Sequence, residues 1–347
     1  MSAKAKTGHL VVFLGPSLPL AQAQQLAPAA DFRPPARQGD VFRVLVKRPR
    51  AIALIDGVFE GAPSVWHHEL RAAIASGVTM FGAASMGALR AVELRGEGMI
   101  GVGAIYERYL RGASSDDGDV ALLHADVSHG FRPLTVPLVN VLATCDAAKK
   151  AKALKALDST RVIGSARGLF FKDRTWPAIL ASCPPQSAQR MKKWLAEGGE
   201  VDQKGIDARA CLGSAAALVD SGALGPSPYP FVGSSFVRRR RLMDAHSQRL
   251  TRVQRHPEAS RLAIDGTKRL LLAALAKAGG VSVTLKERER ARATVPADGL
   301  AADEREFIAE IVALEAKVLQ LPERFVGDGP SPLEGLALEA VLRGLWR

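Results

Sequence analysis

The sequence predicts an α/β protein, with a layered core domain of sheet and helices followed by a mostly helical C-terminal extension. Through the first half of the 347-residue chain, short apolar runs alternate with helical stretches, a pattern typical of layered α/β domains. After Pro184, apolar residues recur at every third or fourth position, which indicates helices. Because single cores rarely grow past ~250 residues, we expect a core domain over residues 1–183 and an extension over residues 184–347.

The expected strands of the core domain are short apolar runs bounded by turn-forming residues. They are residues 10–14, residues 51–55 and the run that begins at Val78. The expected helices between the strands are residues 18–26, 41–46 and 64–76. A proline-rich loop is expected over residues 31–40.

Each of these strands ends in residues suited to a binding site. Ser17 follows the first strand, Asp56 and Gly57 follow the second, and Ser85 follows the third. In open α/β sheets, ligands bind outside the carboxyl ends of the strands. We therefore expect these side chains to face one crevice, although the Asp-Gly pair is also typical of an ordinary turn.

The sequence VTMFGAASMGALRAVEL, residues 78–94, predicts a strand, a turn of small residues and a helix. Its Ala83-x-Ser85-x-Gly87 spacing is close to the G-x-S-x-G nucleophile elbow, with alanine in place of the first glycine. At the start of the helix, the N–H groups of Met86 and Gly87 are the candidate oxyanion donors. The alternative is that Ser85 only caps the helix and that the small residues only permit close packing.

Several strings of the first half together resemble the TfuA-like core domain. They are LVVFLGPS at residues 10–17, AIALIDGVF at 51–59 and GMIGVGAIYERYL at 98–110, with VWHHEL and SMGALRAVEL between the last two. The resemblance runs from about Leu10 to about Pro177. TfuA-like proteins accompany YcaO enzymes, which activate peptide backbone amides with ATP and install thioamides.

The resemblance implies a role in sulfur delivery. A protein of this kind hydrolyses the C-terminal thiocarboxylate of a ThiS-like sulfur carrier protein and helps the YcaO-type enzyme to bind its precursor peptide. It implies a Ser-Lys hydrolase site, in which Ser85 matches the serine by motif, and neither a cofactor nor a metal is expected. The alternative is a non-enzymatic adaptor that recruits carrier and peptide to YcaO.

Two lysines in apolar settings are candidates for the base, Lys172 in GLFFKDRTW and Lys47 in FRVLVKRPR. A lysine acts as a general base only when burial or a neighbouring cation lowers its pKa well below ~10.4. Two phenylalanines precede Lys172 and Arg174 follows it, so we prefer Lys172. The alternative is that Lys172 pairs with Asp173 at a strand edge.

Other polar residues give weaker signals. Arg90 is a candidate to bind a carboxylate terminus, or it pairs with Glu93 on the helix surface. His67 and His68 are adjacent in sequence, whereas ligands on one helix face are spaced three or four apart, so a metal site is not expected. The acidic residues 116–119 lack the glutamate of a calcium loop. A Ser-His pair with His124 or His129 is ranked below Ser-Lys.

The positive charge of the chain is concentrated in one segment. Residues 238–292 hold 15 Lys and Arg against five Asp and Glu, and the whole chain has a net charge of +12. An RRRR run at Arg238–Arg241 favours an acidic or polyanionic partner. The sequence shows no helix-turn-helix, zinc-finger or RNP pattern. The TfuA-like resemblance implies an acidic carrier, the leader of the precursor peptide or the YcaO protein as the partner, rather than nucleic acid. The alternative is a solvated helix face.

The remaining features concern location and cysteine chemistry. The sequence has no run near the ~20 apolar residues that a membrane-spanning helix needs, and the first residues carry no clear signal peptide. We therefore expect a cytoplasmic protein with no membrane partner. Cys145, Cys183 and Cys211 are odd in number and far apart, which favours neither a disulfide framework nor a zinc site.

Overall fold

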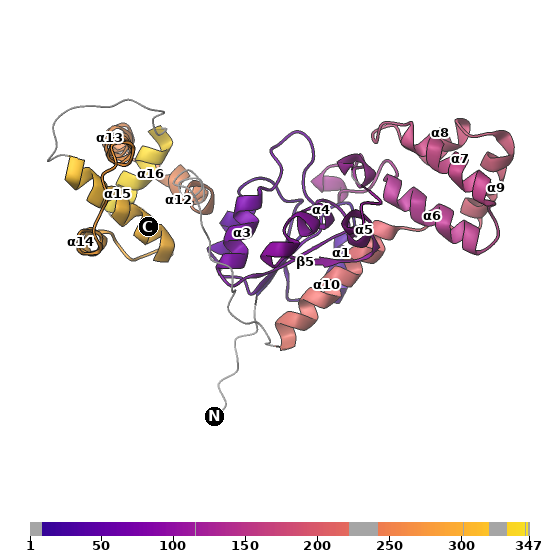
Figure 1. Cartoon of the computed structure of the whole chain (residues 1–347), viewed down its shortest axis with the longest axis horizontal. Helices are drawn as coiled ribbons and strands as arrows, with labels where there is room; N and C mark the ends of the chain where they lie inside the picture. Colours follow the sequence, from indigo (N-terminus) through magenta and orange to yellow (C-terminus); the bar gives the residue numbers. More distant parts are fainter. Residues whose placement is uncertain are drawn as a thin grey trace. The chain divides into compact units, whose positions relative to one another are not determined.

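The computed structural model of the chain forms two compact units, Met1–Phe231 and Val232–Arg347 (Figure 1). The structure describes residues 9–114, 116–221, 242–300, 302–318, 332–343 and 345. The proline-rich stretch GPSPYPFVGSS over residues 225–235 and the RRRR run at Arg238–Arg241 lie outside these described residues.

The first unit contains a five-stranded parallel sheet with the strand order β2-β1-β3-β4-β5. The strands are β1 (Leu10–Phe13), β2 (Asp31–Arg33), β3 (Ala51–Leu54), β4 (Thr79–Ala83) and β5 (Ile100–Val102). All residues of the central strands β1 and β3 are buried, as expected for parallel strands covered on both faces. The predicted α/β class is confirmed.

The prediction of a loop over residues 31–40 is wrong in part, because this segment begins with the edge strand β2. Its three residues are half-buried and include two charged side chains, Asp31 and Arg33. Such a strand has no apolar run, and only the pairing of Val11, Val12 and Phe13 with it defines it.

In the described part of the first unit, ten α-helices accompany the sheet. They are α1 (Leu20–Leu26), α2 (Asp40–Leu45), α3 (His67–Ala75), α4 (Met86–Glu93), α5 (Ala104–Leu110), α6 (Leu138–Lys150), α7 (Ala156–Arg167), α8 (Trp176–Ala181), α9 (Pro185–Ala196) and α10 (Gln203–Ser221). Helices α1 and α10 share a core with Phe81 of β4, and α4 packs against its neighbour Gly82. Since successive strand residues point to opposite faces, α4 covers the face opposite α10.

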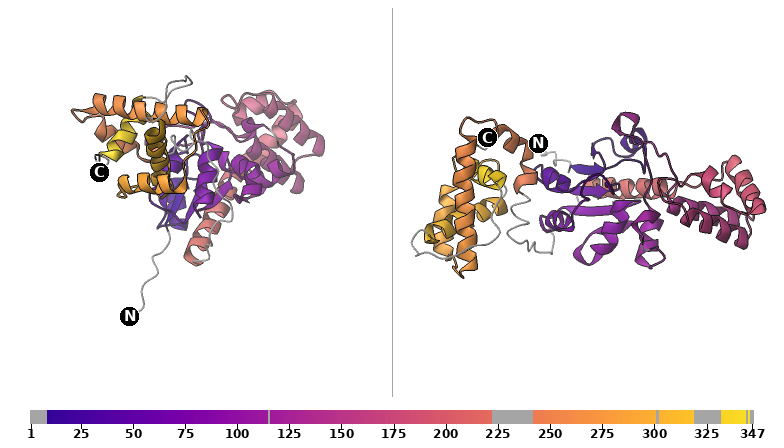
Figure 2. Two further views of the ribbon diagram at one scale, coloured as in Figure 1. Left: turned by 60° about the vertical axis from the view of Figure 1, so that its left-hand side comes forward. Right: turned by 90° about the horizontal axis from the view of Figure 1, so that it is seen from above.

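Helices α6–α9 form a group of their own beside the sheet, drawn in magenta and pink in Figure 2. The boundary predicted between residues 183 and 184 lies between α8 and α9 and therefore inside the first unit. The reason is packing: Met191 of α9 is buried among α6–α8, and Cys211 and Leu212 of α10 are buried against the sheet.

The described part of the second unit is helical, which confirms the predicted mostly helical C-terminal region. Its helices are α12 (Ser247–Val253), α13 (Ala259–Ala278), α14 (Leu285–Thr294), α15 (Ala302–Val318) and α16 (Pro332–Leu342). Several cations of the basic segment pair with acids outside it: Arg269 with Glu315 and Glu339, and Lys277 with Glu310. Among the described residues, none of the helices combines the length and the apolarity that a bilayer crossing requires.

Candidate active site

The serine turn lies between the last residue of β4, Ala83, and the first of α4, Met86. The Ser85 N–H donates to the Ala83 carbonyl at 2.6 Å, and Ala84 has φ +64°, so the three residues form a γ-turn. Positive φ is uncommon outside glycine, and such strain clusters at functional sites. The buried Ser85 side chain makes no capping hydrogen bond to α4, which contradicts the capping alternative.

The glycines of the turn allow the helix to approach the sheet. A Cβ on Gly87 would lie 1.8 Å from the Leu54 carbonyl oxygen of β3, and one on Gly82 would lie 2.1 Å from the Gly87 carbonyl oxygen. No side chain fits at either distance. The close packing that the alternative interpretation named is therefore present, and it holds Ser85 at the carboxyl edge of the sheet.

Lys204 is the lysine that contacts Ser85. Its Nζ donates to Ser85 Oγ at 3.0 Å and to the Val120 carbonyl at 2.9 Å, and only 2% of the residue is exposed. It is the second residue of α10, and its own N–H donates to Asn140 Oδ1 at 3.1 Å. Sequence reasoning missed Lys204 because its polar surroundings, VDQKGID, carry no local sign of burial.

The environment of Lys204 makes its ammonium ion less favourable than that of a lysine in water. Burial lowers its pKa from the ordinary lysine value, while the charges of Asp56 and Asp202 raise the pKa in part. The nearest carboxylate oxygen, Asp56 Oδ1, lies 3.9 Å from Nζ. A buried lysine with a lowered pKa is suited to accept a proton from a serine hydroxyl.

Asp56 is fixed by the turn that follows β1. Its Oδ2 accepts from the N–H groups of Gly15 at 2.8 Å and Ser17 at 3.0 Å, and its Oδ1 accepts from Ser17 Oγ at 2.6 Å. The strand register pairs Phe13 with Leu54, and Leu54 with Gly82, so these strand ends lie along one edge. The structure thus brings Ser17, Asp56 and Ser85 together, with Ser17 orienting Asp56.

Ser85 and Lys204 line a cavity of about 240 Å³. Its other lining residues are Pro16, Pro35, Asp56, Gly57, Val58, Phe59, Glu60, Val120, Ala121, Leu122, Leu123, His124, Phe171 and Lys172. Asp56 and Gly57 are therefore both at the cavity, as expected from their position after β3. His124 also lines it, and its Nδ1 lies 2.7 Å from the Ala125 carbonyl oxygen.

The two lysines favoured by sequence do not contact Ser85. Lys172 lines the same cavity, but its Nζ lies 2.5 Å from Glu60 and its side chain is 42% exposed. Lys47 pairs with Asp31 at 3.3 Å and is 55% exposed. The structure places neither lysine against Ser85, because the aromatic and apolar neighbours that suggested burial leave both amines at the surface.

The structure agrees only in part with the roles expected for the Met86 and Gly87 N–H groups and for Arg90. The Gly87 N–H donates to the Ile55 carbonyl at 3.3 Å, so it is engaged by the sheet. The Met86 N–H has no hydrogen-bond acceptor within the described residues. Arg90 bonds Glu93 at 2.7 Å and the Val65 carbonyl at 3.3 Å, as in the surface alternative, and is not part of the cavity lining.

Metal ligands and reactive thiols are not found at this site. Within the described residues, no group of three or more His, Cys, Asp or Glu side chains is arranged to hold a metal ion. The three cysteines are free and buried, and burial raises the pKa of the Cys145 and Cys211 thiols to about 12. Among the reactive groups of the cavity, the Ser85 hydroxyl and the Lys204 amine are in direct contact.

Comparison with known proteins identifies the family of the central part of the chain. A search of curated proteins found no match. The model of the TfuA-like protein family matches residues 56–175. This segment begins at Asp56, contains Ser85 and ends before Lys204. Over residues 56–175, the chain belongs to the TfuA-like protein family.

Proposed function

We propose that this chain hydrolyses the C-terminal thiocarboxylate of a ThiS-like sulfur carrier and releases hydrosulfide for a YcaO-type enzyme that thioamidates a precursor peptide. The contact that carries the proposal is the 3.0 Å hydrogen bond between Lys204 Nζ and Ser85 Oγ, two buried residues that line one cavity. Family membership supports the YcaO association. The chemistry is assigned to Ser85 as nucleophile and Lys204 as general base.

In the first step, Ser85 Oγ attacks the carbonyl carbon of the thiocarboxylate while neutral Lys204 accepts the hydroxyl proton. The new Oγ–C bond gives a tetrahedral intermediate with a negatively charged oxygen. Of the two expected oxyanion donors, only the Met86 N–H is without an acceptor among the described residues, and we assign it to stabilise this oxygen. The C–S bond then breaks, and Lys204 returns its proton to sulfur, which leaves as hydrosulfide.

In the second step, water hydrolyses the acyl-serine. Lys204 accepts a proton from the water, the water oxygen bonds to the acyl carbon, and the C–Oγ bond breaks as Ser85 regains its proton. The products are the carrier carboxylate, hydrosulfide and a proton. The cavity of about 240 Å³ has room for about eight waters at ~30 Å³ each, so it fits the end of an extended chain but not a folded domain.

The decisive assay measures hydrosulfide release from a thiocarboxylated ThiS-like carrier by the chain alone. We expect release to continue over many turnovers, with the same carrier bearing an ordinary carboxylate as the control. The adaptor alternative predicts no release in the absence of YcaO. If the carrier stays intact both with and without the YcaO enzyme while the chain still binds it, the hydrolase proposal is wrong and the adaptor replaces it.

The pH dependence of hydrosulfide release is expected to report the charge on Lys204. The base acts when neutral, so kcat/KM rises with pH through the lowered pKa of Lys204. Asp56 raises this pKa, and Asp56→Asn removes its charge. The rising limb is therefore expected at lower pH in Asp56→Asn than in the wild type.

The matched control for this profile is Ser17→Ala, which removes the 2.6 Å hydrogen bond to Asp56 Oδ1 but keeps the carboxylate charge. We expect a smaller displacement of the limb in Ser17→Ala. If the rising part of the pH profile of kcat/KM stays in place in Asp56→Asn, or moves to higher pH, the assignment of Lys204 as the base is wrong.

A further inference from the structure

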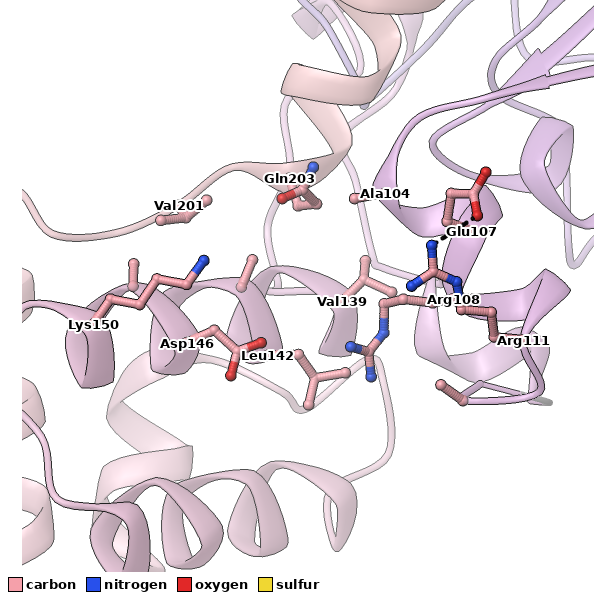
Figure 3. A pocket seen from close by; sticks show the side chains of 13 residues that line it. Ala104, Glu107, Arg108, Arg111, Val139, Leu142, Asp146, Lys150, Val201 and Gln203 are labelled. Carbon is pink, nitrogen blue, oxygen red and sulfur yellow. Dashed lines mark hydrogen bonds and ion pairs between the residues drawn. The ribbon is translucent and has the colours of Figure 1, made fainter.

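A second cavity of the first unit, about 610 Å³ in volume, lies between α5, α6 and the start of α10 (Figure 3). Its lining residues are Ala104, Glu107, Arg108, Arg111, Ala113, Val139, Leu142, Ala143, Asp146, Ala147, Lys150, Val201 and Gln203. Neither Ser85 nor Lys204 is among them. Its volume lies in the ~300–1,000 Å³ range of ligand pockets, and its walls are mostly apolar, as in such pockets.

Arg108 is the unusual group of this cavity. Its Nε atom is buried and has no hydrogen-bond partner among the described residues. Figure 3 shows its side chain extending from α5 toward Leu142 of α6. A buried donor without an acceptor costs about 1–3 kcal/mol and is rare in native proteins. Arg108 therefore presents to the cavity a guanidinium that the described residues leave incompletely bonded.

The other charges of the lining are balanced or exposed. Arg111 pairs with Glu107 at 3.2 Å, as the dashed line in Figure 3 marks, and Asp146 pairs with Lys149 at 2.8 Å. Lys150 is exposed at the rim. Arg108 thus remains as a cation without a carboxylate partner in the described part of the chain, beside apolar walls.

We propose that this cavity is a second binding site, which takes an acidic peptide segment. A glutamate or aspartate of the peptide pairs with the Arg108 guanidinium, which matches a carboxylate bidentately. Apolar neighbours in the peptide pack on Val139 and Leu142. A nucleic acid fits less well, because its regularly spaced phosphates need several unpaired cations, whereas the mostly apolar lining offers Arg108 and the exposed Lys150.

The peptide site lies back to back with the Ser85 cavity. Gln203 and Val139 line the peptide site, and the residues that follow them, Lys204 and Asn140, are hydrogen-bonded to each other at 3.1 Å. Gln203 Nε2 also donates to Asp207 Oδ1 at 2.7 Å. A bound peptide would therefore contact the first turn of the helix that carries Lys204, although its binding does not require hydrolysis.

The test measures the binding of two fluorescein-labelled synthetic peptides to the full chain by fluorescence anisotropy. One peptide alternates leucine and glutamate, and the other has glutamine in place of glutamate. We expect the wild type to bind the glutamate peptide roughly tenfold more tightly or better, as for a charge-assisted pair. Arg108→Gln is expected to abolish this preference. Arg108→Lys keeps the positive charge but lacks the two parallel donors of the guanidinium, and it is expected to retain part of the preference.

The matched control is Arg111→Gln, which removes a neighbouring cation that is 75% exposed and already paired with Glu107. This variant is expected to keep the preference for the glutamate peptide. The proposal is overturned if the wild type binds both peptides equally or binds neither. It is also overturned if Arg108→Gln and Arg111→Gln lose the preference for the glutamate peptide equally, or if a DNA oligonucleotide displaces the labelled peptide and unlabelled peptide does not. Hydrosulfide release by Arg108→Gln is measured in parallel and tests the Ser85 site separately.

Discussion

Replacing Lys204 with methionine is expected to lower the rate of hydrosulfide release by about three orders of magnitude, since a positioned general base contributes typically 10²- to 10⁴-fold. Methionine keeps the length of the side chain but removes the amine that bonds Ser85 Oγ at 3.0 Å. In this variant no amine accepts the proton of the Ser85 hydroxyl, and none returns a proton to the departing sulfur. Single-turnover release from the thiocarboxylated carrier measures the effect.

Two further variants make this result specific. Ser85→Ala is expected to lose as much activity, and the double variant no more than either single one, because residues that act as a unit are not additive. Lys172→Met alters a lysine of the same cavity that pairs with Glu60, and it is expected to stay within about twofold of the wild type. A large loss in Lys172→Met together with an active Lys204→Met would reverse the assignment of the base.

Gly87→Ala is expected to destabilise the first unit by about 3 kcal/mol or more, at the upper end of the range for overpacked cores. The added Cβ would lie 1.8 Å from the carbonyl oxygen and 2.7 Å from the carbonyl carbon of Leu54. Both contacts are with the backbone of a central strand, which cannot rotate away as a side chain can. Urea unfolding followed by circular dichroism measures the change in midpoint.

Gly96→Ala provides the control for this substitution. Gly96 lies in the 3₁₀ turn Arg95–Glu97, and a Cβ there meets no atom within 4 Å. Its free energy of unfolding is expected to remain within about 0.5 kcal/mol of the wild type, as for surface substitutions away from special features. An unchanged midpoint in Gly87→Ala would show that α4 can move away from β3.

Much of the fold could be predicted because its signals are local. Strands β1 and β3 are covered on both faces, so burial requires the continuous apolar runs that identify them. The edge strand β2 escaped prediction because its residues are half-buried and partly charged. Residues 203–221 lie in the region predicted to be helical, but the sequence did not show that this helix, α10, packs against the sheet. That packing depends on Cys211 and Leu212, which are buried against the strands.

The candidate site divides in the same way. The turn around Ser85 was predictable, because small residues between a strand and a helix are a pattern of neighbours in sequence. The hydrogen bond of the Gly87 N–H was not predictable, since its acceptor is the carbonyl of Ile55, which follows another strand, β3. Arg90 shows the converse case, in which the surface pair with Glu93 was one of two stated alternatives.

By itself, the sequence determined the α/β class, the serine turn and the TfuA-like resemblance of this protein, because each depends on residues that are close together in the chain. Only the tertiary structure decided which lysine meets the serine. Lys204 is 119 residues from Ser85, and α10 brings it to the edge of the sheet by packing its apolar face there. Its pKa is lowered by burial among distant segments, a property that no local pattern encodes.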